Sequence, residues 1–590
     1  MIRRLPSSLS RPLVSPLAAT TSRHAAAAVR FNSSIGKPTH PLGQNSGTTH
    51  PRRWIAGSLA IGTSAILVAY YYDSRSVVHE HVVMPLIRRL VPDAEDGHKI
   101  AVKILSLPSW ARPHDTGVDG PELETELFGL PLSNPVGVAA GFDKDAQAID
   151  GLFDLGFGYV EVGSVTPVPQ PGNPKPRFFR LEEDDAAINR YGFNSLGHGH
   201  ALAQLRSRLV RFSQEHPTLF PNATGNPLPP DGLPRSLRPG HILGVNLGKN
   251  KTSPADSNEG YVKGVRLLGP YADVIVINVS SPNTPGLRAL QGAEELERLL
   301  SDVKAEREKI VQNGLPKIAV KVTCDLSEEG LADVAAAVRK TGIDGVIISN
   351  TTLRREGLQS ENKDQVGGLS GRPLFPYALA ALKTLRPLLP PSVPIIGAGG
   401  IWTGEDALAM ARAGASTVQV YTSFGYRGVG TPALIKDEVS RLLVPADATW
   451  REQIGADFKD THLGWDESRV AAESARLRAE AASLADVLRQ AAEKDSLASL
   501  VAETEAALAR YNTPSSPAAA AAAAPKAIGA APASTPAAAP TVGLITGVPE
   551  VAVVPASDAP LPIEAPAPVP EPTRQDAWAD EVRSGPRRLV

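Results

Sequence analysis

Hydroxyl and amide side chains cluster directly after a run of β-branched residues near the middle of the chain. The run, Val274–Ile277, has the composition of a buried strand, and it is followed by Asn278, Ser280, Ser281, Asn283 and Thr284. Enzymes built from parallel strands and helices place their chemistry at such carboxyl strand ends. The same residues would also suit a polar loop without a chemical role, so the stretch alone leaves both interpretations open.

Seven further apolar runs between residues 134 and 443 end in small or hydrogen-bonding residues. These ends include Ala139, Ala140, Gly141, Lys144, Ser164, Asn246, Lys321, Ser349, Asn350, Thr351, Gly400, Tyr421 and Thr422. An asparagine follows three of the eight runs, and its amide both donates and accepts hydrogen bonds. Together the ends predict a site for a flat heterocycle with amide-like edges, such as a flavin or a pyrimidine.

Glycines in two of the loops are suited to an anion. The turn Gly397–Gly400 precedes a predicted helix, whose N-terminus favours negative charge. A second glycine segment, Gly367–Gly371, could supply the opposite wall of a phosphate site. Neither a dinucleotide fingerprint nor a P-loop is present, because Trp402 replaces the last glycine of the first motif and no Ser or Thr follows Gly248-Lys249.

Lys321 lies inside an apolar run, where its charge is costly unless it meets a negative partner. An anionic reduced flavin would be one such partner, and a carboxylate within the sheet would be another. The residues alone do not decide between them.

The composition excludes several classes of protein. The single cysteine, Cys324, excludes a disulfide framework and a multi-cysteine metal site. No HExxH motif and no His, Asp or Glu cluster with metal spacing occurs, so no metal is expected. A formal net charge of −2 gives no indication of nucleic-acid binding.

Alternation of the eight runs with helical stretches predicts a (β/α)8 TIM barrel over residues 120–460. The runs cover residues 135–140, 158–163, 242–247, 274–279, 317–322, 345–350, 393–399 and 417–422. A Pro-rich surface insertion is expected at residues 216–240. A doubly wound open sheet is the alternative architecture.

The segment before the barrel has the composition of a mitochondrial, membrane-associated protein. Residues 1–51 are basic, Ser-rich and free of Asp and Glu, which predicts a transit peptide and linker, with a disordered basic arm as the alternative. Residues 54–72 are uncharged and about 28 Å long as a helix, which predicts a transmembrane helix rather than a buried core helix. The positive-inside tendency then leaves the remainder of the chain outside the matrix.

Residues 77–110 predict two short amphipathic helices, which would suit a membrane surface and the mouth of a site for a lipid-soluble molecule. Helices that merely cap the following domain are an equally good interpretation. After the barrel, residues 465–511 predict a helical extension with coiled-coil character, and residues 512–590 an Ala- and Pro-rich disordered tail.

Five motifs, in this order along the chain, resemble the membrane-associated, quinone-dependent class of the dihydroorotate dehydrogenase family. They are Ala139–Lys144, Asn189–Ser195, Gly244–Lys251, Asn278–Arg288 and Ile395–Ile401. The resemblance extends from about Val77 to Asp460.

The resemblance implies an FMN site and a dihydroorotate site within the barrel. FMN would be held by Ala139, Ala140, Gly141, Ser164, Asn246, Asn278, Lys321, Ser349 and Thr351, and its phosphate by Gly371, Gly400, Tyr421 and Thr422. Dihydroorotate would contact Lys144, Asn189, Tyr191, Gly192, Phe193, Asn278, Asn283, Thr284, Asn350 and Thr351. Ser281 would be the base that removes the C5 proton, and His98, Arg180 and Tyr421 would form the quinone site.

The implied activity is oxidation of dihydroorotate to orotate in pyrimidine synthesis, with ubiquinone as electron acceptor. The implied place is the inner mitochondrial membrane, with a single-pass anchor and the catalytic domain facing the intermembrane space. Ser349, where the family usually has threonine, and Arg88, where a shorter polar residue is common, depart from the pattern, and the tail has no counterpart.

Three points stay open at the level of sequence. A serine base needs activation, which a desolvated site, Thr284 or a water could supply. An FMN barrel acting on a dihydropyrimidine that lacks the carboxylate is a second enzyme hypothesis. A membrane-tethered scaffold that recruits partners through the helical and Ala/Pro-rich tail is a non-enzyme hypothesis.

Overall fold

The computed structural model describes residues 51–220, 227–254, 256–284, 287–310 and 314–461, with parts of the segment between 472 and 505. The chain divides into two units, Met1–Thr63 and Ser64–Val590, and the architecture below is that of the second. The predicted transit peptide, apart from Pro51, and the predicted disordered tail at 512–590 lie outside the described residues.

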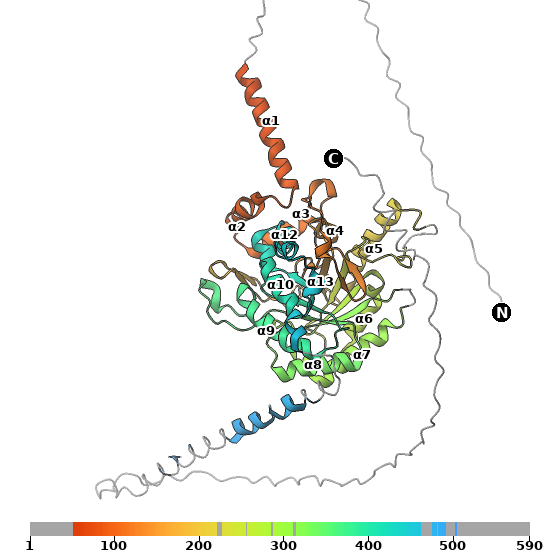
Figure 1. The fold of residues 1–590 in the computed structure, drawn as a ribbon, viewed down its shortest axis with the longest axis vertical. Coiled ribbons are helices and arrows are strands. Elements are labelled where there is room, and N and C mark those ends of the chain that lie inside the picture. Colours follow the sequence, from red (N-terminus) through yellow and green to blue (C-terminus); the bar gives the residue numbers. More distant parts are fainter. Residues whose placement is uncertain are drawn as a thin grey trace, which may run out of the picture. The chain divides into compact units, whose positions relative to one another are not determined.

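Eight parallel strands close into a barrel surrounded by helices (Figure 1), which confirms the TIM-barrel prediction. In sequence order they are β3 (Val136–Val138), β4 (Tyr159–Val165), β7 (Ile242–Leu247), β8 (Val274–Asn278), β9 (Lys317–Val322), β10 (Gly345–Ile348), β12 (Ile395–Ala398) and β13 (Ala415–Val420). Each corresponds to one predicted run. The open-sheet alternative is wrong, because β13 pairs with β3 and thereby closes the sheet.

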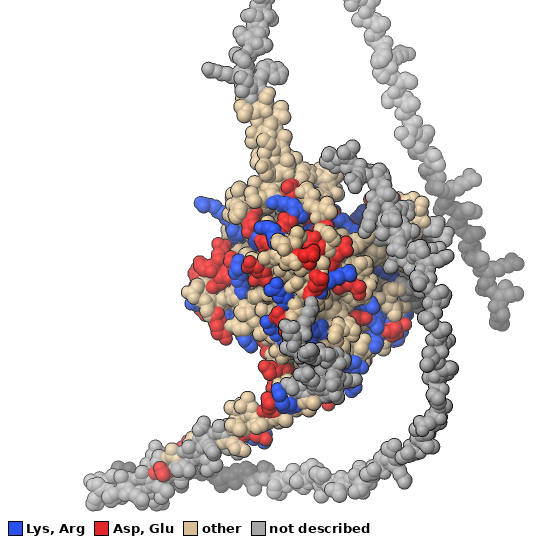
Figure 2. Space-filling view, in the orientation of Figure 1, with Lys and Arg blue, Asp and Glu red and all other residues tan. Residues whose placement is uncertain are grey.

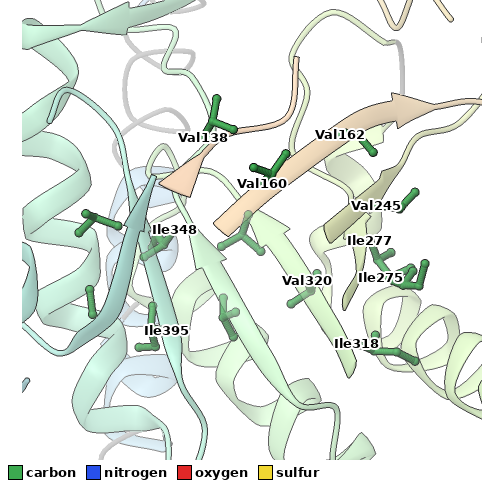
Figure 3. Close-up of a cluster of buried hydrophobic side chains, with 14 of the residues drawn as sticks. Val138, Val160, Val162, Val245, Ile275, Ile277, Ile318, Val320, Ile348 and Ile395 are labelled. Carbon is green, nitrogen blue, oxygen red and sulfur yellow. The ribbon is translucent and has the colours of Figure 1, made fainter. Parts of the chain in front are cut away.

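The strands are apolar on both faces because each face packs against something. Alternate residues such as Val245, Ile275 and Ile318 belong to a large cluster shared with the surrounding helices (Figure 3). The other set, including Tyr159, Val274 and Ile347, forms a smaller cluster with a hairpin of β1 (Thr125–Leu127) and β2 (Leu130–Leu132). The strand alternation thus separates a helix-facing layer from a barrel-interior layer.

Helices of the second unit follow the strands and cover the outside of the barrel (Figure 1). They are α4 (Ile149–Asp154), α5 (Gly197–Glu215), α6 (Glu259–Leu268), α7 (Ala293–Arg307), α8 (Glu328–Thr341), α9 (Phe375–Leu385), α10 (Gly404–Arg412), α11 (Thr422–Arg427), α12 (Thr431–Leu443) and α13 (Trp450–Gln453). Local sequence explains several boundaries. Thr403 and Asp406 form a capping box at α10, and Gly342 ends α8 at a φ of 61°.

A small antiparallel sheet above the strand ends was not predicted. It contains β5 (Phe178–Leu181), β6 (Ala186–Asn189) and β11 (Gly368–Gly371), in the order β11-β6-β5. Asn189 pairs with Gly368 on one side and with Phe178 on the other. This sheet brings residues nearly two hundred positions apart to one side of the barrel mouth.

Two short helices precede the barrel, as predicted for residues 77–110. They are α2 (Met84–Leu90), which continues a π-helical turn at His79–Val83, and α3 (Ala94–Leu105). Asp93 separates them and caps α3 by accepting hydrogen bonds from the backbone N–H groups of Glu95 and Asp96.

The predicted helix at 54–72 is present as α1 (Pro51–Tyr72), and Figure 2 shows its described part without charged side chains. The prediction that it crosses a membrane is not supported. Among the residues that the structure describes, no helix is long and apolar enough to do so.

The surface away from α1 mixes both signs of charge. On the face shown in Figure 2, Lys and Arg alternate with Asp and Glu, in line with the small net charge. The insertion predicted at 216–240 begins directly after α5, and its described residues form neither helix nor strand. The described part of the C-terminal extension is helical at residues 475–480 and 482–490, and Arg478 pairs with Asp333 of α8 at 2.7 Å.

We predict that Trp450→Ala lowers the free energy of unfolding by about 3–5 kcal/mol. The Trp450 side chain is fully buried, and its Nε1 donates to the Ser416 carbonyl at 2.9 Å, so alanine leaves a cavity and an unpaired acceptor. Urea unfolding of the full chain measures the loss. Trp110→Ala, at a site that is 76% exposed, is the matched control and should change stability by less than about 0.5 kcal/mol.

Candidate active site

A pocket lies at the carboxyl ends of the barrel strands. The residues that were predicted as site residues and that line it are Ala139, Ala140, Gly141, Lys144, Ser164, Asn189, Tyr191, Gly192, Phe193, Asn278, Ser281, Asn283, Lys321, Ser349, Asn350, Thr351, Gly371, Gly400, Tyr421 and Thr422. Asn246 and Thr284 are buried but do not line it, and His98 and Arg180 line a second pocket. The structure therefore brings the predicted strand ends together around one volume.

The floor of the pocket is a network of amides and hydroxyls. Asn278 Nδ2 donates to Ser164 Oγ at 3.0 Å, and Ser164 Oγ donates to Asn246 Oδ1. Asn350 Nδ2 donates to Ser280 Oγ at 2.9 Å and to Asn278 Oδ1 at 3.3 Å. These bonds fix which amide edge each side chain presents, and they explain why the sequence needs asparagine at three strand ends.

Beneath this floor lies a carboxylate that was not predicted, Glu161 of β4. It is fully buried, and its Oε1 accepts from Lys321 Nζ at 3.3 Å and from Asn246 Nδ2 at 2.8 Å. Its Oε2 accepts from Gln419 Nε2 at 2.5 Å and from the Tyr159 hydroxyl at 3.3 Å. Of the two negative partners considered for Lys321, the structure shows the carboxylate within the barrel. Lys321 also lines the pocket.

Sequence reasoning missed Glu161 and Gln419, although a signal was available. Both lie inside apolar runs, as Lys321 does, and a charged or amide side chain inside such a run indicates a partner within the barrel. A search for complementary polar residues in the other runs would have found them. Trp402 and Pro282 also line the pocket, and their sequence positions carry no comparable signal.

Ser281 lines the pocket from the loop that follows β8, and this loop contacts the small sheet. Its side chain is buried, and among the described residues its Oγ accepts one hydrogen bond, from Asn283 N at 3.3 Å. Asn283 Nδ2 in turn donates to Asn189 Oδ1 of β6 at 3.3 Å and to the Asn189 carbonyl at 3.2 Å. The buried Thr284 hydroxyl has no hydrogen-bond partner among the described residues. The serine is therefore held in place without a protein base bonded to it in this part of the chain.

Lys144 provides positive charge at another wall. Its Nζ donates to the Gly141 carbonyl at 2.6 Å and lies 4.4 Å from the centre of the Tyr191 ring. Burial lowers the pKa of Lys144 to about 8, because water no longer solvates the ammonium. The group is charged at neutral pH and is placed to meet an anion that enters the pocket.

At two positions of the predicted phosphate site only glycine fits, because a Cβ would collide with neighbouring backbone atoms. A Cβ on Gly371 would lie 2.3 Å from the Asp185 carbonyl oxygen, and one on Gly400 would lie 2.5 Å from Phe375 N. Both residues have positive φ, 100° and 74°. Thr422 Oγ1 donates to Ser370 Oγ at 2.8 Å and joins this side of the pocket to β11.

A second pocket lies between α2, α3 and the barrel mouth, and most of its lining side chains are apolar. Tyr421 and Thr422 line both pockets, so the two volumes share a wall. Arg88 also lines the second pocket, where its Nη1 donates to the Tyr426 carbonyl at 3.2 Å.

His98 and Arg180 are two of the polar side chains that line the second pocket. Burial lowers the pKa of His98 to about 3, so the imidazole is neutral at pH 7. Its Nε2 lies 2.7 Å from the Phe142 carbonyl, which can only accept, so Nε2 carries the proton and Nδ1 is an acceptor. Arg180 donates to the Pro92 carbonyl at 2.8 Å, and burial lowers the pKa of its guanidinium. His98 thus offers an acceptor and Arg180 offers N–H donors within a pocket whose lining is mostly apolar.

Comparison with known proteins gives one consistent result. Residues 122–443 match the family model described as dihydroorotate dehydrogenase. The mitochondrial dihydroorotate dehydrogenase (quinone) of Kluyveromyces lactis is 47% identical over 417 residues, which cover 68% of this chain and 90% of that protein. The protein of the same name from Mus musculus is 45% identical and is covered to 98%, with 69% of this chain. A crystal structure of the Eimeria tenella enzyme in complex with ferulenol, 37% identical, matches with a TM-score of 0.57 and covers 63% of this chain and 99% of that one.

We predict that breaking the Glu161–Lys321 pair from one side destabilises the protein by about 3–5 kcal/mol, because the remaining charge is buried without its partner. Glu161→Gln and Lys321→Met should each show this loss in urea unfolding, and the double variant should lose clearly less than the sum. Lys317→Met is the control on the same strand, because its pair with Asp344 at 3.5 Å is partly exposed, and it should cost less than about 1 kcal/mol. Additive losses would contradict a direct interaction between the two side chains.

Proposed function

The chain belongs to the dihydroorotate dehydrogenase family, and from this premise we propose that it oxidises dihydroorotate to orotate in pyrimidine synthesis and passes the electrons to a quinone. The observation that carries the proposal is the shared wall. A polar pocket suited to a ring with amide edges and an apolar pocket suited to a quinone meet at Tyr421 and Thr422. A two-electron carrier placed at this wall would serve both.

The proposed carrier is FMN, and the pocket fits it in three respects. The amide and hydroxyl floor matches the polar edge of an isoalloxazine, Lys321 supplies positive charge, and the backbone at Gly371 and Gly400, both at positive φ, lines the pocket where the phosphate would bind. Bound FMN would take the hydride from substrate C6 and later supply electrons to the quinone. The residues that would hold it are Ala139, Ala140, Gly141, Ser164, Asn246, Asn278, Lys321, Ser349 and Thr351, with Gly371, Gly400, Tyr421 and Thr422 at its phosphate.

The proposed substrate contacts follow from charge and hydrogen bonding. Lys144 would pair with the carboxylate, and the asparagine amides would bond the ring's N–H and C=O groups. The full set is Lys144, Asn189, Tyr191, Gly192, Phe193, Asn278, Asn283, Thr284, Asn350 and Thr351. A dihydropyrimidine without the carboxylate would leave Lys144 without a use, which disfavours that alternative.

Ser281 is the proposed base for the C5 proton. Its burial and its hydrogen bond from Asn283 N hold the hydroxyl at the wall, and the N–H bond stabilises the oxygen as it gains negative charge. As Ser281 takes up the C5 proton it must release its own, and the buried, unpartnered Thr284 hydroxyl would relay that proton by passing its own on to water. Desolvation, Thr284 or a water can each assist, and the three are compatible.

The proposed quinone site is the second pocket, with His98, Arg180 and Tyr421 as its polar groups. Arg180 would donate to a quinone oxygen, and His98 Nδ1 would accept from a quinol hydroxyl. We place the protein in the mitochondrion, at the inner membrane. Exposed apolar side chains at Val82, Leu86 and Leu90, on and before α2, support contact with lipid, from which the quinone would enter.

Anaerobic mixing tests the function directly. The purified protein should contain flavin whose absorbance bleaches on addition of dihydroorotate and returns on addition of a quinone. Ser281→Ala should retain FMN and slow the bleaching at least about 100-fold, because general-base catalysis is lost. Ser301→Ala, at an exposed position of α7, should behave as wild type. Normal bleaching in the Ser281 variant would refute the role of this residue.

We also predict that Lys144 gives kcat/KM for dihydroorotate an alkaline limb near pH 8. The ammonium is charged below its pKa of about 8 and loses its charge as the pH rises, so attraction for the substrate carboxylate is lost above that pH. Dividing the wild-type pH profile by that of Lys144→Met isolates this limb from the titration of other groups. Dihydrouracil, which lacks the carboxylate, is the control substrate and should show no Lys144-dependent limb.

A further inference from the structure

A buried ion pair joins α3 to the segment that precedes β5. Arg177 Nε donates to Glu95 Oε2 at 2.9 Å, and Arg177 Nη2 donates to Glu95 Oε1 at 3.0 Å. Glu95 is 2% exposed and Arg177 is 8% exposed. Burial alone would raise the pKa of Glu95, but hydrogen bonds from Arg177 and Lys99 hold it at about 2, so the carboxylate is charged. A two-point buried pair of this kind fixes distance and orientation together.

Arg177 continues the connection to the wall of the proposed substrate pocket. Its Nη1 donates to the Pro171 and Asn173 carbonyls at 2.6 and 2.8 Å, and Asn173 N donates to the Tyr191 carbonyl at 2.8 Å. The Arg177 guanidinium also lies 5.3 Å from the centre of the Tyr191 ring. Tyr191 lines the pocket and packs against Lys144, so Arg177 holds this wall through both the backbone and the ring.

An adjacent face of α3 lines the apolar pocket. Ala94, Gly97, His98, Ala101 and Ile104 all belong to that lining, and Ala94 directly precedes Glu95. The side chains of α3 therefore line the second pocket, and its Glu95 contacts the wall of the first pocket through Arg177. A ligand that packs against α3 acts on the helix that carries this carboxylate.

The charged and titratable groups around Lys144 come from several elements. Asp143 and Asp145 belong to its own loop, Arg177 precedes β5, and Glu95 and His98 belong to α3. Both loop carboxylates are engaged by backbone N–H groups, Asp143 by those of residues 147 and 148 and Asp145 by that of residue 196. Glu95 is thus the carboxylate through which α3 affects Lys144.

We propose that the Glu95–Arg177 pair couples the two pockets, so that a quinone bound against α3 tightens binding of the anionic pyrimidine at the Tyr191–Lys144 wall. The proposal rests on the proposed function. A bound quinone restrains α3, and the ion pair transmits this restraint to the Tyr191–Lys144 wall. The pyrimidine then binds to a wall that is already ordered, so its binding costs less conformational entropy. Coupling of binding free energies is reciprocal, so orotate must tighten quinone binding by the same factor. Glu95 and Arg177 act here as positioning residues.

The test uses the oxidised holoenzyme, orotate and oxidised decylubiquinone, a combination in which no turnover occurs. Titration of flavin absorbance gives the Kd of orotate with and without saturating quinone. In the wild type we expect orotate to bind about fivefold or more tightly with quinone present. The reverse titration, of quinone with and without orotate, should give the same factor and needs no variant.

Glu95→Gln and Arg177→Gln should remove the difference, and the double variant should equal either single one because the pair acts as a unit. Glu95→Asp should retain part of it. Lys103→Met is the matched control, because Lys103 is an exposed residue of the same helix and makes no ion pair with Glu95, and it should retain the full factor.

Equal orotate affinity with and without quinone in the wild type would overturn the proposal while leaving the proposed function intact. Full coupling in Glu95→Gln, even with a lowered melting temperature, would assign the pair a purely structural role and also overturn it. A wild type that neither binds orotate nor is reduced by dihydroorotate would refute the proposed function itself, and the coupling with it.

Discussion

Glu161 is the group on which the arrangement of the barrel mouth depends. A carboxylate with no exposed surface must have its oxygens bonded, and four side chains from four strands do this: Tyr159, Asn246, Lys321 and Gln419. The strands cannot shift relative to one another without breaking one of these bonds. Because Asn246 bonds Ser164, and Ser164 bonds Asn278, the order imposed at Glu161 continues to the pocket floor. The pocket floor is therefore held rigid by the hydrogen bonds to Glu161, which lies beneath it inside an otherwise apolar barrel.

Much of this architecture can be read from the sequence, because barrel strands and their ends are local features. Each run, such as Val274–Ile277, is a few residues long, and the polar residue that follows it lies at the barrel's carboxyl edge by topology alone. The strand ends Ser164, Asn278 and Lys321 were placed in this way. Gly371 was proposed for a phosphate wall as part of a glycine segment, whereas Asn189 was assigned only through family resemblance, since no local pattern places it at the mouth.

The remainder depends on pairings between distant segments, which no local pattern specifies. The small sheet pairs Asn189 with Gly368, and its short strands carry no periodic signal that distinguishes them from loop. The partner of Lys321 lies on β4, 160 positions away in sequence, so the choice between a flavin and a carboxylate could not be made from the run alone. The structure shows that the alternatives were not exclusive. Glu161 lies below Lys321 and the pocket adjoins it on the other side.

The two lysines of the site differ in a way that suits their proposed tasks. Lys321 has a buried carboxylate as its partner, so its charge is stabilised whether or not a ligand is present. Lys144 Nζ donates instead to the Gly141 carbonyl, and burial brings its pKa to about 8. An ammonium without a bonded carboxylate gains most from an anion that arrives later, because the anion both neutralises and solvates it. The permanent pair therefore suits the proposed cofactor site, and the incompletely compensated charge suits the proposed site where substrate binds and leaves.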